Sequence, residues 1–364
     1  MLELLALMLA GIHCSVPLAY YFYAKKKWLP RPWNVKVDEN YKPKISIILP
    51  TYNEAKLIES KLDDICKQNY PKSLIEIIVV DSASEDGTPN VVKKWMKGKE
   101  GIDVKLLVED ERKGKFNALK KALEQISHES EILIFTDADA FWEPNSLKNA
   151  VKYFADVTVG SVTASITYEN ETIENTYRQY FNTLRVAESK IHSVPIHNGP
   201  FYAIKVDLIR KIGLPNFLGS DDSAFGSYVA FTGHRSIQVD DVIVKEPVRG
   251  SQFRRKIRRA QTALTSFLNT KGYAKKMGLY VKSPFEKIWR IELWLHVINP
   301  WLLLSSAILF VADAVHGSII ALMLLGLGFV FLALKPWRTW VLQQLYLILA
   351  MLRNVWTKEI MWSK

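Results

Sequence analysis

Ile75-Glu76-Ile77-Ile78-Val79-Val80-Asp81 is a short, nearly continuous apolar run that ends in an aspartate. Its β-branched residues favour a β-strand, and its apolar character on both faces indicates a strand that is buried on both sides. The residues that follow, Ser82 to Thr88, are small and polar, which is typical of a turn. We expect this turn to lead into a helix over residues 89–97.

The same order of strand and helix repeats on both sides of this run. The further predicted strands cover residues 44–50, 104–108 and 131–136, and the further predicted helices cover residues 51–68 and 115–125. Apolar strands separated by helices predict an α/β fold with a mostly parallel sheet that carries helices on both faces. Because ligands bind at the carboxyl ends of such strands, Asp81 and Asp137-Ala138-Asp139 are expected to face one crevice.

Asp137-Ala138-Asp139 places two carboxylates close together directly after a predicted strand. Both side chains can approach one hard divalent cation, Mg²⁺ or Mn²⁺, of the kind that bridges phosphates; a solvated turn is the alternative interpretation. The sequence lacks the Gly-x-x-x-x-Gly-Lys-Ser/Thr motif, and no Gly-x-Gly-x-x-Gly follows the first strand. These absences argue against a P-loop nucleotide hydrolase and against a dinucleotide-binding domain.

The composition excludes several classes of protein. The chain has 364 residues, of which 49% are hydrophobic, so a disordered protein is excluded. Two cysteines, Cys14 and Cys66, argue against a disulfide-rich secreted fold. The net charge of +11 could indicate nucleic acid, but the basic residues concentrate beside apolar runs, where anionic lipid headgroups explain them. We expect no nucleic-acid partner.

Apolar runs lie at both ends of the chain, over residues 2–23, 291–315 and 318–334. Each is treated as a transmembrane helix, the first as an uncleaved anchor. Basic residues flank the same side of the membrane each time: Lys25, Lys26, Lys27, Lys335 and Arg338. The positive-inside rule then predicts an integral protein of the cell membrane, or of an endomembrane, with its catalytic domain in the cytoplasm.

This pattern predicts six segments along the chain. They are an anchor (residues 1–24), a linker (25–43), a cytoplasmic catalytic domain (44–248), a basic amphipathic interfacial segment (249–290), two transmembrane helices (291–334), and an interfacial helix with a cytoplasmic tail (335–364).

Four ordered motifs resemble one known family. They are Pro50-Thr51-Tyr52-Asn53-Glu54, the run from Val79 to Thr88, Gly114-Lys115, and Asp137-Ala138-Asp139. Together they resemble the N-terminal half of a family 2 glycosyltransferase with a GT-A-type, Rossmann-like fold. The resemblance extends from about Lys44 to Arg259.

The resemblance implies a role for each matching position. Nucleotide-sugar binding is implied for Pro50, Thr51, Tyr52, Glu54, Asp81, Lys115 and Asp137. Asp139 is implied to be the firmer ligand of the Mg²⁺ or Mn²⁺ ion, with Asp137 beside it.

The second half resembles the acceptor side of the same family. Gly219-Ser220-Asp221-Asp222 resembles the motif that carries the general base, with Asp222 as the base and Asp221 where the family often has glutamate. A carboxylate suits this role because the acceptor hydroxyl must lose a proton as it attacks the anomeric carbon. The alternative is that these aspartates cap the following helix.

A basic run from Arg249 to Arg259 contains Gln252-x-x-Arg255. The family often shows Gln-x-x-Arg-Trp here, and this chain has Lys256 in the tryptophan position. Processive polysaccharide synthases stack the growing polymer on that tryptophan, so its absence argues against extrusion of a polymer. Arg255, together with Arg258 or Arg259, is expected to hold the departing diphosphate.

We therefore predict an inverting transferase that moves one sugar from a UDP- or GDP-linked donor to a lipid acceptor at the membrane. The acceptor is either a polyprenyl phosphate or a glycolipid hydroxyl. Two alternatives stay open: a processive polysaccharide synthase, and a membrane-tethered nucleotide-sugar-binding protein without turnover.

Overall fold

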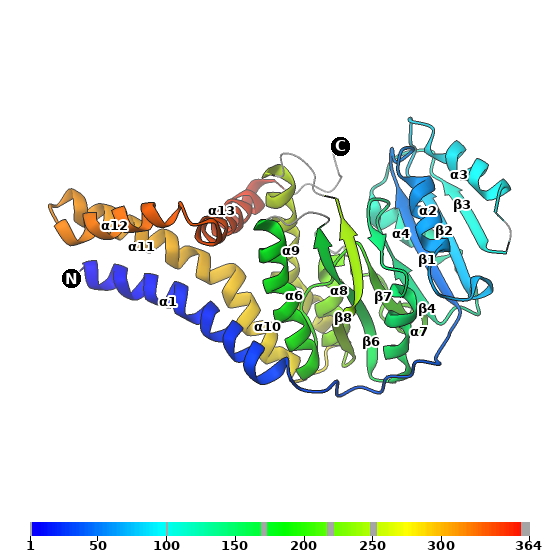
Figure 1. The fold of residues 1–364 in the computed structure, drawn as a ribbon, viewed down its shortest axis with the longest axis horizontal. Helices are drawn as coiled ribbons and strands as arrows, with labels where there is room; N and C mark the ends of the chain where they lie inside the picture. The colour runs from blue at the N-terminus through cyan, green and yellow to red at the C-terminus, as the bar shows by residue number, and fades with distance from the viewer. Residues whose placement is uncertain (1, 100, 169–172, 217–221, 248–252, 358–364) are drawn as a thin grey trace.

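A single mixed sheet forms the centre of the globular part (Figure 1). The computed structural model describes residues 2–99, 101–168, 173–216, 222–247 and 253–357. The sheet has eight strands in the order β3-β2-β1-β4-β7-β6-β8-β5. The strands are β1 (Ile45–Thr51), β2 (Ile75–Asp81), β3 (Asp103–Val108), β4 (Ile132–Phe135), β5 (Phe141–Trp142), β6 (Val159–Tyr168), β7 (Tyr202–Lys205) and β8 (Arg235–Glu246).

The prediction of a mostly parallel sheet is confirmed for one half and wrong for the other. β1 pairs in parallel with β2 and β4, and β2 pairs in parallel with β3. Beyond β4, the strand β7 is antiparallel to both β4 and β6, and β5 is antiparallel to β8. Only β6 and β8 are parallel in this half. These pairings join residues far apart in the chain, so no local pattern encodes their direction.

Helices cover both faces of the sheet, as predicted, because successive strand residues point to opposite sides. In β1, Ile47 packs with α2 (Ile58–Cys66) and α3 (Thr88–Lys97). Ile48 packs in the cluster on the other face. The helices of that face are α4 (Lys115–Leu123), α7 (Val206–Ile212), α8 (Asp222–Phe231) and α9 (Phe253–Lys276). The shorter α5 (Ser146–Val151) joins the first face, and α6 (Ile173–Ile191) packs against β6 and β8.

The predicted helix over residues 51–68 begins only at Ile58. The residues before it form a turn whose backbone N–H groups bond to the loop after β2. Asn53 donates to Ser84 Oγ (2.8 Å) and Ala55 donates to Asp86 Oδ2 (3.0 Å). Asn53 also has a positive φ of 54°, which a helix does not allow. The ends of β1 and β2 are therefore tied together.

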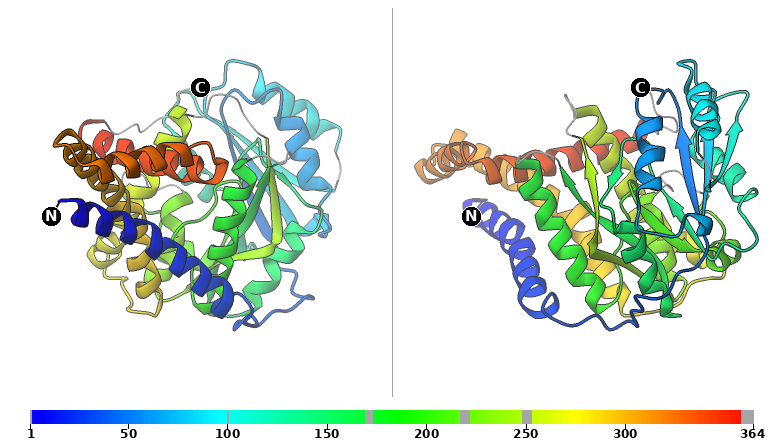
Figure 2. Two further views of the ribbon diagram at one scale, coloured as in Figure 1. Left: turned by 60° about the vertical axis from the view of Figure 1, so that its left-hand side comes forward. Right: turned by 45° about the vertical axis from the view of Figure 1, so that its right-hand side comes forward.

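An apolar arm projects from the globular part (Figures 1 and 2). It contains α1 (Leu2–Tyr23), which continues as η1 (Ala24–Trp28), and a second long helix made of α10 (Phe285–Leu293), η4 (Trp294–Ile298) and α11 (Asn299–Val315). The arm also includes α12 (Ile319–Phe331) and α13 (Lys335–Trp356), which both contact α11. These two helices, Leu2–Trp28 and Phe285–Val315, are long and apolar enough to cross a membrane. α1 packs along α11, where the Ser306 hydroxyl donates to the Ala6 carbonyl at 3.0 Å.

The third predicted span, residues 318–334, contains one short helix. α12 (Ile319–Phe331) has 13 residues, which gives about 20 Å, less than the ~30 Å of a hydrocarbon core. It is followed by α13 (Lys335–Trp356), and the two helices are bent by 105°. They count as a span only if this bent pair is taken together.

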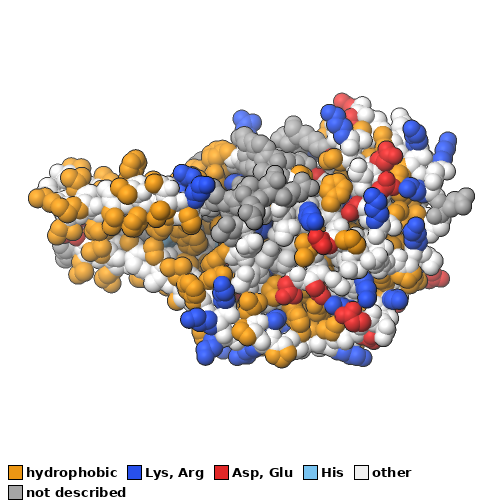
Figure 3. Space-filling model, in the orientation of Figure 1, with side chains coloured by type: hydrophobic (Ala, Val, Ile, Leu, Met, Phe, Trp, Pro, Cys, Tyr) orange, Lys and Arg blue, Asp and Glu red, His pale blue; other side chains and the backbone are white. Residues whose placement is uncertain are grey.

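The surface of the arm fits a lipid environment. Figure 3 shows apolar side chains over its length, and Leu322 and Phe329 are 63% and 76% exposed. Lysine and arginine side chains gather where the arm meets the globular part (Figure 3). Lys25, Lys26 and Lys27 of η1, which follows α1, are exposed.

Candidate active site

Asp81 ends β2 and is fully buried. Its Oδ1 accepts hydrogen bonds from the hydroxyls of Ser84 (2.6 Å) and Thr51 (3.2 Å), and its Oδ2 accepts from the Ser84 backbone N–H (2.9 Å). Asp81 therefore fixes the loop after β2 against the end of β1. A direct contact with the nucleotide remains a prediction.

Asp137 lies two residues beyond the end of β4, the strand on the other side of β1. The Lys115 ammonium, at the start of α4, lies 3.0 Å from Asp137 Oδ1. Burial acts to raise the pKa of Asp137, but Lys115, Arg259 and Arg255 together hold that pKa below its ordinary value. The carboxylate is thus kept ionised by three cations from two helices.

The candidate base Asp222 lies beside Asp137. Asp222 is in the first turn of α8, and its carboxylate packs against Gly199. A Cβ at Gly199 would overlap this carboxylate and lie 3.5 Å from Asp137 Oδ2. Because Gly199 has no side chain, its backbone can lie close to both carboxylates. Asp222 of α8 and Asp137, which follows β4, can therefore share one site.

The loop that carries Gly199 is anchored to the sheet on two sides. The Asn198 amide donates to the Ala164 carbonyl at 2.8 Å, and the Thr136 hydroxyl donates to the Pro200 carbonyl at 2.9 Å. These bonds tie the loop to β6 and to the end of β4. The position of Asp222 relative to Asp137 thus depends on the sheet and not on α8 alone.

The first turns of α9 bring positive charge to the same site. Arg255 and Arg259, four residues apart, both act on Asp137. Arg259 also forms an ion pair with Glu246 of β8 (3.2 Å) and senses the charge of Asp222. Arg259 lines the cavity described below and Arg258 does not, so the predicted role of Arg259 beside the diphosphate stays a prediction.

Lys61 of α2 is a charged residue that the sequence reasoning missed. Its side chain is fully buried, its ammonium lies 3.2 Å from Asp64 Oδ2, and it sits 3.9 Å from the centre of the Trp142 ring. Burial lowers the pKa of Lys61 to about 8, against the opposing charges of Asp64, Asp137 and Asp139. The sequence feature that could have indicated a buried Lys61 is its spacing from Leu57 and Ile65, which places it on the apolar face of the helix.

Other predicted residues lie at the same edge of the sheet. Pro50 and Thr51 are in β1, and the Arg112 guanidinium lies 3.8 Å from the centre of the Tyr52 ring. Glu54 contributes its backbone, whose carbonyl accepts from Ile58 N–H at 2.9 Å. The predicted residues Asp221 and Gln252 lie outside the described residues.

The acidic residues fit a divalent cation that is shared with a substrate. Among the described residues, which exclude 100, 169–172, 217–221 and 248–252, no group of three or more His, Cys, Asp or Glu could hold a metal ion alone. Mg²⁺-like ions, however, are commonly bound by one or two carboxylates together with substrate phosphates. Asp137 and Asp139, both partly exposed after β4, supply such oxygen ligands.

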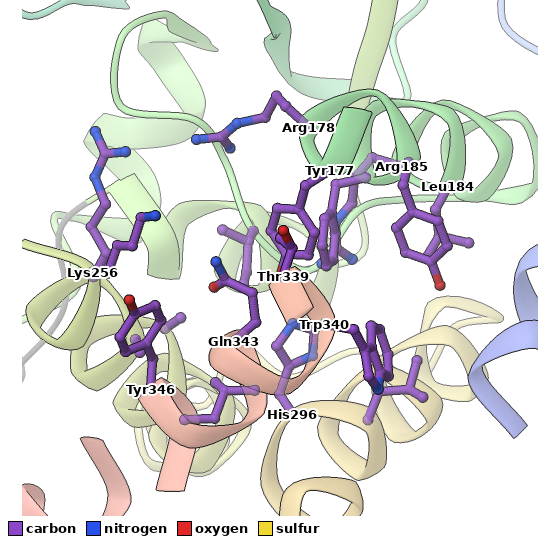
Figure 4. Close-up of a pocket in the computed structure, with 18 of the residues that line it drawn as sticks. Tyr177, Arg178, Leu184, Arg185, Lys256, His296, Thr339, Trp340, Gln343 and Tyr346 are labelled. Carbon is purple, nitrogen blue, oxygen red and sulfur yellow. The ribbon is translucent and has the colours of Figure 1, made fainter. Parts of the chain in front are cut away.

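A cavity of about 270 Å³ is lined by side chains of the globular part and of the apolar helices (Figure 4). Its wall includes Asn198 and the two arginines Arg255 and Arg259 on the side of the sheet. On the side of the arm it includes Pro17 of α1 and Trp340 of α13. Side chains from α6, α9, α13 and η4 point into this space (Figure 4).

Comparisons with known proteins support the predicted family and fold. Residues 46–213 match the family model "Glycosyl transferase family 2". The chain is 41% identical to a mannosyltransferase, PcManGT from Pyrobaculum calidifontis, whose structure was solved in complex with GDP-Man and Mn²⁺; the match covers 99% of this chain and 100% of that one, with a TM-score of 0.88.

Two curated relatives match over shorter stretches. Glycosyltransferase AglE of Haloferax volcanii is 29% identical over 57% of this chain and 68% of its own length. A poly-beta-1,6-N-acetyl-D-glucosamine synthase of Staphylococcus epidermidis is 26% identical over 56% of this chain, which spans 49% of that synthase. From the motif match, the fold and the full-length similarity together, we conclude that the chain is a nucleotide-sugar-dependent glycosyltransferase and belongs to glycosyl transferase family 2.

Proposed function

We propose that this enzyme moves a single sugar from its donor to a lipid acceptor at the cytoplasmic face of a membrane. The observation that carries the proposal is the course of the cavity. It begins at Arg255 and Arg259, whose charges act on Asp137, and extends to Pro17 of the apolar arm. A nucleotide-sugar is dissolved in water and a lipid stays in the bilayer, so the two substrates need a shared space of this kind.

The donor that we propose is GDP-mannose. The support is the similarity to the Pyrobaculum calidifontis mannosyltransferase, which extends over nearly the whole of this chain. Asp139 and Asp137 would hold the divalent cation, Mn²⁺ or Mg²⁺, which when bound neutralises the diphosphate of the donor.

The proposed reaction is a direct displacement. The acceptor oxygen attacks the anomeric carbon from the face opposite the diphosphate, and the bond from that carbon to the diphosphate oxygen breaks with its electron pair. Asp222 takes the proton of an acceptor hydroxyl, while Arg255 and Arg259 stabilise the departing negative charge. An acceptor phosphate, already ionised, would need no base. The sugar configuration is inverted in either case.

The orientation in the membrane rests on charge. Lys25, Lys26 and Lys27 follow the first candidate span, and Lys335 and Arg338 follow α12. Excess lysine and arginine marks the cytoplasmic side of membrane proteins, so we propose that the globular part is cytoplasmic.

Incubation of protein-containing membranes with radiolabelled GDP-mannose and Mn²⁺ tests this function. We expect label in one lipid that is extracted into organic solvent, and no label without the enzyme. A ladder of polymers would instead support a processive synthase. Donor binding with neither product would contradict the proposed transfer to lipid. Thermal stabilisation by a panel of GDP- and UDP-sugars identifies the preferred donor independently.

A further inference from the structure

A fully buried lysine lies beneath the turn that carries the two candidate cation ligands. Lys61 of α2 has no exposed surface, and its ammonium donates to the Ala140 carbonyl at 2.5 Å. Ala140 directly follows Asp139. The reaction proposed above makes no use of this buried charge, so its place here needs a reason of its own.

The turn directs its acidic residues outward and its alanines inward. Asp137 and Asp139 are partly exposed, whereas Ala138 and Ala140 are buried. The Ala140 N–H donates to the Asp137 carbonyl at 3.4 Å, which closes the turn. The placement of both carboxylates therefore depends on how the backbone of this turn is held.

The start of the turn is held by the sheet and by the loop that carries Gly199. The Thr136 N–H donates to the Ile48 carbonyl of β1 at 3.2 Å, and the Thr136 hydroxyl donates to the Pro200 carbonyl at 2.9 Å. Both contacts lie before Asp137. They fix one end of the turn and leave the end after Asp139 to other residues.

Lys61 and Asp64, one turn apart on α2, hold that other end. Besides the Ala140 carbonyl, the Lys61 ammonium contacts Asp64 Oδ2 at 3.2 Å and lies 3.9 Å from the centre of the Trp142 ring. Asp64 Oδ2 also accepts the Trp142 backbone N–H at 3.1 Å. The pair thus binds the backbone at Ala140 and at Trp142, so the turn is fixed on both sides.

Stability alone does not account for a lysine at this position. The neighbouring buried residues of α2, Leu62 and Ile65, are apolar, and an apolar side chain here would avoid the cost of taking an ammonium out of water. Replacement of a buried ion pair by apolar residues is often neutral or stabilising. An apolar side chain, however, has no N–H group to donate to the Ala140 carbonyl. These contacts therefore favour a role in the geometry of the turn.

We propose that Lys61 and Asp64 are positioning residues for the divalent cation, which hold the end of the turn so that the Asp139 carboxylate meets the ion. They act through the backbone of the turn and not by contact with the ion. The inference rests on the proposed function, because it takes Asp137 and Asp139 as the ligands of Mn²⁺ or Mg²⁺. Removal of a group that orients a metal ligand commonly costs about 10- to 100-fold in metal affinity.

The opposite charges of the pair separate positioning from a direct effect of charge. At pH 7 the ammonium form of Lys61 predominates, because its pKa is about 8. Lys61→Met then removes a positive charge near the cation site, and Asp64→Asn removes a negative one. A charge effect alone would tighten Mn²⁺ binding in the first variant and weaken it in the second. Positioning predicts weaker Mn²⁺ binding in both.

The test measures Mn²⁺ binding to the full-length protein in nanodiscs at pH 7 with saturating GDP, from the electron paramagnetic resonance signal of free Mn²⁺. We expect the Kd for Mn²⁺ to rise about tenfold or more in Lys61→Met and in Asp64→Asn. Lys67→Met, the same change at the exposed lysine that caps α2, should keep the wild-type Kd. Thermal denaturation shows whether each variant is folded, and a merely structural role would lower the Tm without changing this Kd.

Wild-type or tighter Mn²⁺ binding in either folded variant would overturn the inference and leave the proposed function standing. A wild-type protein that binds no Mn²⁺ in the presence of GDP would overturn the proposed cation site as well. The Asp64 side chain is 14% exposed, so Asp64→Asn decides the test if Lys61→Met does not fold.

Discussion

Gly199 packs against the carboxylate of Asp222 at a distance that leaves no room for a Cβ atom. The same point lies next to Asp137, so this glycine sets the separation between the acid at the end of β4 and the acid at the start of α8. Asp137 and Asp222 are about 85 positions apart in the chain. Because both carboxylates lie close together here, this edge of the sheet is a candidate catalytic centre.

Gly199→Ala should lower the rate of sugar transfer by about 100-fold, because the added methyl group displaces the Asp222 carboxylate. The measurement is kcat for transfer, with thermal denaturation to show that the protein remains folded. Gly272→Ala is the matched control, since a Cβ there meets nothing within 4 Å. A Gly199→Ala enzyme with the wild-type kcat would show that the position of Asp222 is not critical.

Lys115→Met should move the acid limb of the pH–rate profile to higher pH. Lys115 helps hold the pKa of Asp137 below its ordinary value, so removing this cation raises that pKa and neutralises the carboxylate sooner as the pH falls. The profile of kcat/KM from pH 4 to 8 gives the shift. Lys113→Met, which removes an exposed lysine paired with Glu111, should leave the limb where it is. If the acid limb of the kcat/KM profile of Lys115→Met lies at the wild-type pH, the ionisation of Asp137 does not control the reaction.

Arg255→Ala should reduce kcat by about 100-fold, because one of the charges expected to stabilise the departing diphosphate is lost. Arg258→Ala, three residues along the same helix but not on the cavity wall, should stay near the wild-type kcat. Steady-state kinetics with varied donor concentration measures both. Equal losses in the two variants would indicate a general effect on α9.

Lys61→Met should change how stability depends on pH. The pKa of Lys61 is about 8 in the folded protein and 10.5 ordinarily, so between these values the unfolded chain binds more protons. The contribution of Lys61 to the free energy of unfolding of the wild type therefore increases as the pH rises from 8 to 10. The Tm of the wild type relative to Lys61→Met should rise over that range. Lys67→Met, at an exposed lysine, should show a flat difference; a flat difference for Lys61→Met would contradict its assigned pKa.

The strands from β1 to β4 and the acids at their ends could be predicted from the sequence, because each strand and its helix lie within about 30 residues. Asp81 and Asp137 end apolar runs, and their common edge follows from parallel pairing. The direction of β7 could not be predicted, since its partners β4 and β6 are chosen by the path of the whole chain.

The cavity escaped sequence reasoning for a similar reason. Its opposite walls come from α6 and α13, which are more than 140 residues apart, and nothing in either segment identifies the other. Lys61 was missed because a lysine within an apolar stripe is normally treated as exposed. The third span was predicted from hydropathy, which registers the apolar residues of α12 but not the 105° bend between α12 and α13.

The central claim is that, within one site, Asp139 holds the cation of the donor diphosphate and Asp222 takes the proton of the acceptor. Calorimetric titration measures the binding of GDP-mannose to the protein in the presence of Mn²⁺, and an assay of sugar transfer to lipid measures the reaction. Both are applied to Asp139→Asn and Asp222→Asn, with Asp207→Asn as an exposed control. We predict that Asp222→Asn binds the donor but loses transfer by about 100-fold or more, and that Asp139→Asn loses Mn²⁺-dependent donor binding. Wild-type transfer by Asp222→Asn, or wild-type donor binding by Asp139→Asn, would contradict the account.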